Sequence, residues 1–192
     1  MISVPTYLQD AKELLTDDGF ATGDIWYHGT SSALIASIKG QGLKRSGDKA
    51  LNEAAQKTMA TIGNNYTEST EPVFLTQSKE LAYYWAQQTV RERSVRFEGD
   101  EQPIVLAVNL SEKQQAKVRP DVGAMSLLMM SIGENFMAHL AKVYQECGIE
   151  GPDIDLRSAD RMDYQNKLGM AYINEDISRA CISEVLEPEM AD

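Results

Sequence analysis

Residues 26–31, Trp-Tyr-His-Gly-Thr-Ser, form the stretch around which the rest of the predicted fold is arranged. The chain is apolar or aromatic up to Tyr27, as in a short buried strand, and turns small and polar from His28 onward. This change predicts a strand that ends at His28 and a tight turn at Gly29. A glycine in such a turn lets a ligand approach the backbone closely.

A short helix is predicted directly behind this turn. Ser31 and Ser32 are favoured N-cap residues, and Gly40 and Gly42 suit the end of the helix. The buried face would carry Leu34, Ile35 and Ile38. Free N–H groups and the positive end of the helix dipole favour a phosphate or amide ligand. The stretch therefore predicts a strand, a turn and a helix arranged around a ligand.

Two segments flank this unit. Within residues 1–24, Thr6 and Gln9 have the spacing of a capping box, which predicts an amphipathic helix of about ten residues. Residues 44–71 predict an inserted helix, over 50–62, followed by a polar loop. This insertion is either a lid over the site or a surface excursion without a role.

The rest of the chain alternates between strand and helix patterns. Residues 103–110 are apolar enough for a central strand, and Ser78 is placed to cap a helix over 79–96. A long helix is predicted over 126–147, with Gly133 as a candidate break. Further strands are predicted at 72–76, 153–157, 170–173 and 179–185.

Length and composition narrow the class of protein. The chain has 192 residues, which favours a single domain over residues 1–192. Its net charge is −11, from 29 acidic and 18 basic residues, so nucleic acid is an unfavourable partner. An acidic surface fits a protein target with a basic patch, or serves solubility alone.

The two cysteines and the N-terminus indicate the cellular compartment of the protein. Cys147 and Cys181 lack the spacing of a zinc site or a disulfide framework, so we expect free thiols and no metal. The start of the chain has no signal-peptide pattern, and no apolar run reaches 18 residues. We expect a cytoplasmic protein without a membrane partner, either native to that cytoplasm or delivered into it.

The motifs together resemble a known superfamily. Residues 27–30 (Tyr-His-Gly-Thr), the helix ending at Leu43, residues 72–76 (Pro-Val-Phe-Leu-Thr) and the pair Ala82 and Tyr84 follow in the order seen in ADP-ribosyltransferases. The similarity is to the histidine-containing branch, which includes diphtheria toxin and the poly(ADP-ribose) polymerases, and it covers residues 25–110. It implies an α+β fold of two packed mixed or antiparallel sheets, with surrounding helices and an NAD crevice.

The resemblance also implies roles for individual residues. His28 would donate a hydrogen bond to the ribose beside nicotinamide, while Gly29 and Thr30 complete the binding of NAD. Phe74 and an aromatic residue of the following helix would hold the nicotinamide ring between them. That second residue is Tyr84, or Trp85 if the family's longer spacing applies.

The remaining histidine and the catalytic acid match the family less well. His139 lies in the middle of a predicted helix and is interpreted as an ordinary packed or surface residue. The family commonly places a glutamate at the start of a late strand, and here that position falls near Gly169. Asp163 is the first candidate for the acid that stabilises the ribosyl cation, and Glu175 is the second.

These expectations define one leading function. It is NAD-dependent mono-ADP-ribosylation of a protein target, by an enzyme of the kind that a bacterium or phage uses as an effector. The alternatives are an RNA 2′-phosphotransferase, an NAD glycohydrolase, and a degenerate relative that acts by binding alone.

Overall fold

Strand β5 (Pro103–Asn109) lies at the centre of a three-stranded antiparallel sheet, as its apolar sequence predicted. β3 (Ile25–Ser31) pairs with one edge of β5, and β8 (Ile182–Leu186) pairs with the other. The structure, a computed structural model, describes residues 3–61, 70–155 and 157–187.

A second antiparallel sheet has the strand order β4 (Val73–Leu75), β7 (Ala171–Ile173), β6 (Arg119–Pro120). A backbone bridge joins the two sheets, where Tyr27 and Thr76 exchange hydrogen bonds of 2.8 and 3.0 Å. Beyond this bridge β3 and β4 continue into different sheets. The bridge therefore marks the place where the sheets part.

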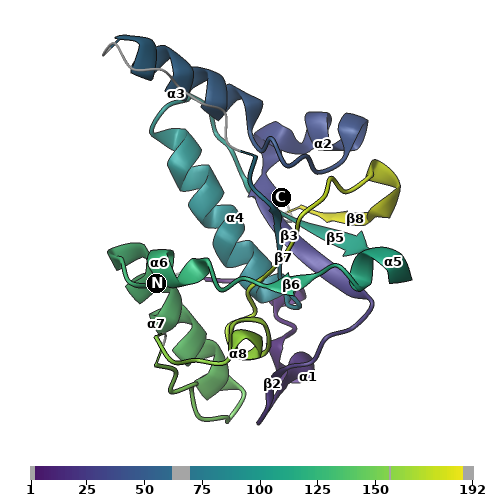
Figure 1. Ribbon diagram of the computed structural model, residues 1–192, viewed down its shortest axis with the longest axis vertical. Coiled ribbons are helices and arrows are strands. Elements are labelled where there is room, and N and C mark those ends of the chain that lie inside the picture. The colour runs from purple at the N-terminus through teal and green to yellow at the C-terminus, as the bar shows by residue number, and fades with distance from the viewer. Residues whose placement is uncertain (1–2, 62–69, 156, 188–192) are drawn as a thin grey trace.

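The three-stranded sheet is covered on both faces. Because side chains alternate along a strand, Trp26 and Leu106 face the second sheet and pack with Leu75 in one apolar cluster. Helix α4 (Lys79–Ser94) covers the other face, where Ala82 packs near Val105. Figure 1 shows α4 running beside the sheet.

The other helices surround these layers (Figure 1). They are α1 (Ala11–Leu14), α2 (Ile35–Gln41), α3 (Lys49–Thr61), α5 (Glu112–Gln115), α6 (Ala124–Leu128), α7 (Ser131–Glu146) and α8 (Arg161–Asn166), with 3₁₀ turns at Thr6–Leu8, Ser32–Leu34 and Arg179–Cys181. The predicted α+β class with antiparallel sheets is thus confirmed. Within the described residues, none of the helices has the length and hydropathy needed to cross a bilayer.

Several local signals act as the sequence predicted. The Ser78 hydroxyl accepts a hydrogen bond from the Leu81 N–H at the start of α4, and Ser31 caps the turn that precedes α2. Gly42 follows α2 with φ +78°, a conformation that glycine adopts without strain. The helix predicted over 50–62 is confirmed by α3, while residues 62–69 of the following loop lie outside the described residues.

The predicted ten-residue N-terminal helix is wrong. Thr6 begins only a 3₁₀ turn, and α1 has a single turn before a hairpin of β1 (Leu15–Thr16) and β2 (Gly19–Phe20). The expected capping box does not form: Pro5, not Thr6, is the N-cap residue, and the Gln9 side chain donates to the Val4 carbonyl.

Other elements also differ from the predictions, among them the strand predicted at 179–185, which begins with a 3₁₀ turn over Arg179–Cys181. β3 does not end at His28 but stays in register with β5 through Ser31, so Gly29 lies in a strand and not in a turn. The long helix divides at residues 129–130, and Gly133 lies in the first turn of α7, against the Leu128 backbone. Residues 153–155 and 157 are not in a strand, because no neighbouring strand pairs with them there.

Candidate functional site

His28 lies in β3, next to the bridge at which the two sheets part. Its Nδ1 is 2.8 Å from the Phe74 carbonyl oxygen. Since a carbonyl can only accept, Nδ1 carries the hydrogen, and the neutral ring leaves Nε2 as an acceptor. No partner for Nε2 is found among the described residues.

Burial lowers the pKa of His28 below its usual value, so the ring is neutral at neutral pH. The backbone of β4 fixes its orientation and tautomer. A ribose hydroxyl at Nε2 would therefore donate the hydrogen bond, and His28 would accept it. This reverses the direction expected from the sequence.

Phe74, whose backbone carbonyl contacts His28, has an exposed aromatic ring. It is 44% exposed, because its neighbours Val73 and Leu75 point into the core between the sheets. The register places Phe74 opposite Tyr172. A half-exposed phenylalanine in a strand gives a flat ligand a surface on which to stack.

The same sheet face continues with two residues that the sequence reasoning missed. Tyr172 on β7 lies opposite both Phe74 on β4 and Arg119 on β6. The Arg119 guanidinium donates hydrogen bonds to the Ala116 and Val118 carbonyls. The signal was present in the alternation around Tyr172, since Ala171 and Ile173 are both buried. The three paired positions thus carry two aromatic side chains and one cationic side chain.

Gly29 and Thr30 serve packing in this structure. A Cβ atom on Gly29 would overlap the Ala82 carbonyl oxygen and stand 2.6 Å from the Ala86 nitrogen. Thr30 is only 2% exposed. Helix α4, and not a ligand, therefore makes the close approach that was expected at Gly29.

Tyr84 is a core residue. It is 1% exposed, its ring stacks on His139 at 5.0 Å, and its hydroxyl is buried without a hydrogen-bond partner among the described residues. Trp85 is only partly buried and stacks on Phe136, with ring centroids 4.9 Å apart. The structure thus does not bring the Tyr84 ring to the surface beside His28.

Both candidate acids already have partners. Asp163 accepts the Asp160 N–H at 3.2 Å in the capping box of α8, and it forms a 2.9 Å ion pair with Lys167. Glu175 is ion-paired with Lys117. The described residues contain no group of three or more His, Cys, Asp or Glu side chains that could hold a metal ion.

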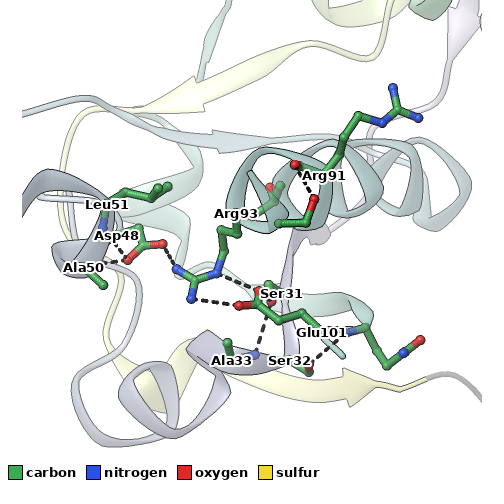
Figure 2. A network of polar contacts seen from close by, with 12 residues as sticks. Ser31, Ser32, Ala33, Asp48, Ala50, Leu51, Arg91, Arg93 and Glu101 are labelled. Atoms are coloured by element: carbon green, nitrogen blue, oxygen red, sulfur yellow. Dashed lines mark hydrogen bonds and ion pairs between the residues drawn. The ribbon is translucent and has the colours of Figure 1, made fainter. Parts of the chain in front are cut away.

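A buried ionic network braces the far end of β3. Figure 2 shows Arg93 of α4 between Asp48 and Glu101. Its Nε and Nη2 donate to the two Glu101 oxygens at 2.7 and 3.0 Å, while the Ser31 hydroxyl donates to the same carboxylate. Asp48 in turn accepts the Ala50 N–H at the start of α3.

Charge pairing dominates this network. Arg93 holds the pKa of Glu101 below its usual value, and the Glu101 carboxylate raises that of Arg93. The network begins at Ser31, three residues after His28, and ties β3 to α4 and to the segments that precede α3 and β5. It fixes the position of the strand that carries His28.

A separate surface hollow of about 380 Å³ lies at the edge strand β8. Two cations, Lys39 and Arg179, line it together with Ala180, Ile182, Ser183, Glu184 and Val185. None of the predicted site residues belongs to it.

Comparisons of the chain with family models, with curated proteins and with solved structures find no match.

Proposed function

We propose that this chain binds NAD at His28 and transfers ADP-ribose from it to a protein. The observation that carries the proposal is the 2.8 Å contact of His28 Nδ1 with the Phe74 carbonyl. It holds a neutral imidazole with Nε2 available to a ribose hydroxyl, and the exposed Phe74 ring supplies a surface for nicotinamide. The motif order of residues 27–30, 72–76 and 82–84 supports the same activity.

The reaction needs positioning more than it needs an elaborate set of catalytic groups. The bond between nicotinamide and the ribose C1′ breaks, nicotinamide leaves with the bonding electrons, and C1′ gains positive charge. A nucleophile of the acceptor then bonds to C1′ and releases its proton. Fixing the ribose through His28 and the leaving ring against Phe74 would bring C1′ and the acceptor together.

A protein acceptor agrees with the charge of the chain. The net charge of −11 repels nucleic acid over long range and attracts a basic protein surface. We therefore propose a protein target within a cytoplasm, as expected for an effector.

One observation favours a second candidate, an NAD glycohydrolase or an NAD-binding protein without transfer. Asp163 caps a helix and Glu175 is ion-paired, so both expected acids are engaged in local structure. If neither of these two acids activates an acceptor, water or no acceptor at all would take its place.

Labelled NAD incubated with the protein and a cell lysate distinguishes these functions. A labelled protein band supports transfer, free ADP-ribose supports hydrolysis, and binding without either product supports the non-enzymatic candidate. Absence of NAD binding by calorimetry would overturn all three.

Two variants test the role of His28 directly. A glutamine amide reaches roughly to the position of Nε2, whereas an asparagine amide reaches roughly to Nδ1. His28→Gln should therefore retain more NAD affinity than His28→Asn, which should lose about tenfold or more for one missing hydrogen bond. Arg179→Ala, in the separate hollow, is the matched control and should bind normally. Equal affinity in all three variants would contradict the assignment.

A further inference from the structure

Two buried carboxylates join the N-terminal segment to helix α4. Asp10 is 8% exposed and Glu80 is 6% exposed. Asp10 accepts the Ser78 hydroxyl at 2.7 Å and the Lys79 N–H at 2.8 Å, at the start of α4. Glu80 accepts the Ala11 N–H, at the start of α1. Each carboxylate therefore caps the helix that carries the other one.

Apolar contacts attach the same segment on either side of this pair. Val4 and Leu8 pack in a cluster with Tyr83 of α4. Leu15 and Phe20 pack in the main core cluster, which includes residues of α7. Residues 4–20 thus run over the start of α4, held by two apolar anchors with the carboxylate pair between them (Figure 1, purple).

We propose that residues 4–20 form a strap whose seating on α4 depends on a proton held by Glu80. With that proton bound, only Asp10 is charged at the buried contact. When it is lost, two negative carboxylates repel each other across a buried contact, and the contact between strap and helix weakens. The strap is then released from α4 while the sheets stay folded.

The charged neighbours agree with this direction. Burial, Asp10 and Glu146 raise the pKa of Glu80 to about 7, against an opposing effect of Lys142. Burial also raises the pKa of Asp10, whose hydrogen bonds at α4 favour its charged form.

Other titratable groups around the contact keep their charge state near pH 7. They are Cys147 and Tyr144, whose pKa values are raised, His139, whose pKa is lowered to about 4, and Tyr27, whose pKa burial and Asp10 raise. Lys12 and Lys79 add positive charge near Cys147 and Asp10 respectively.

The size of the effect follows from linkage. Glu80 titrates near 7 in the seated strap and returns to its ordinary value of 4.5 after release. The seated form therefore holds the proton more tightly, and a rise in pH favours release. The equilibrium constant for release should grow roughly tenfold between pH 6 and pH 8.

Hydrogen exchange of the intact chain tests the strap. After correction for intrinsic rates, the amides of α1 and β1 should exchange about tenfold faster at pH 8 than at pH 6, while those of β5 keep their protection. In Glu80→Gln, the exchange of the α1 amides should no longer depend on pH. Unchanged protection of the α1 amides, or an equal loss in β5, would overturn the proposal.

Two surface variants keep the test valid if Glu80→Gln fails to fold. Lys142 and Glu146 form an exposed ion pair on α7, so replacing either one spares the core. Glu146→Gln removes a negative neighbour of Glu80, so Glu80 should bind its proton less tightly. The transition should therefore move to lower pH. Lys142→Gln should move the transition to higher pH. Shifts in the opposite directions, or none, would overturn the proposal.

Discussion

Gly29 of β3 lies directly against Ala82 of α4, so closely that a Cβ atom on Gly29 would overlap the Ala82 carbonyl oxygen. The strand and the helix therefore meet backbone to backbone at the residue that follows His28. This contact sets how deeply α4 lies on the sheet. Any side chain at position 29 must push the helix away.

Gly29→Ala should lower the free energy of unfolding by about 3 kcal/mol or more, because the neighbouring atoms are backbone and cannot move aside. Urea denaturation measures this change. Gly40→Ala is the control, since Gly40 lies in α2 with nothing within 4 Å of its Cβ position. It should be neutral or stabilise the fold by about 0.5–1 kcal/mol. Equal stability of the two variants would contradict the packing assigned to Gly29.

Arg93→Lys should destabilise the fold although it keeps the charge. A lysine cannot donate to both Glu101 oxygens and to Asp48 at once, so partly buried carboxylates lose partners. We expect a loss of about 3 kcal/mol, within the range for breaking a buried ion pair. Lys49→Ala breaks an exposed pair with Glu53 and should cost less than about 1 kcal/mol. Both are measured by chemical denaturation, and a change below 1 kcal/mol in Arg93→Lys would show that the network is dispensable.

His139 should make the protein less stable in acid. Burial, followed by Lys142, lowers the pKa of His139 to about 4, from 6.5 in the unfolded chain. The folded state holds this proton less tightly, so the stabilisation is complete above pH 6.5 and is lost as the pH falls toward 4. The total contribution is up to about 3 kcal/mol. We compare the free energy of unfolding of the wild type with that of His139→Phe between pH 7 and pH 4. As the pH falls, the wild type should lose stability relative to the variant. A difference that stays constant would contradict the assignment.

Tyr84→Phe should leave stability unchanged or raise it by about 1 kcal/mol. It removes a buried hydroxyl that has no partner among the described residues and keeps the ring stacked on His139. Tyr84→Ala should instead cost about 3–5 kcal/mol, because it leaves a cavity in the core. Thermal unfolding measures both. A stable Tyr84→Ala that had lost NAD affinity would restore the stacking role expected from the sequence.

Asp163→Ala should act on stability and not on NAD binding. It removes a hydrogen bond of the α8 capping box and the ion pair with Lys167, which together contribute about 1 kcal/mol. Glu175→Gln is the matched control, because Glu175 is also paired with a lysine. If Asp163→Ala lost about 10²–10³ in turnover with normal stability, Asp163 would be the acid of the reaction after all.

Local signals sufficed where neighbouring residues decide the structure. Ser78 caps α4, Gly42 follows α2, and the apolar run of residues 103–109 forms the central strand. Each rests on a hydrogen bond, a φ angle or a run of side chains within a few residues. The sequence also placed His28 and Phe74 on strands, although it could not show that the Phe74 carbonyl holds the His28 ring.

The sequence alone therefore determined the α+β class, the central strand and the starts of α3 and α4, since these depend on contacts within one turn or strand. Only the tertiary structure decided that Tyr84 is buried, that Gly29 faces α4, and that Asp10 caps a helix 69 residues further along the chain. A helical or strand pattern gives the face on which a side chain lies, but not what covers that face. Burial, partner and pKa depend on elements distant in sequence, so the fold had to bring them together before any of them could be assigned.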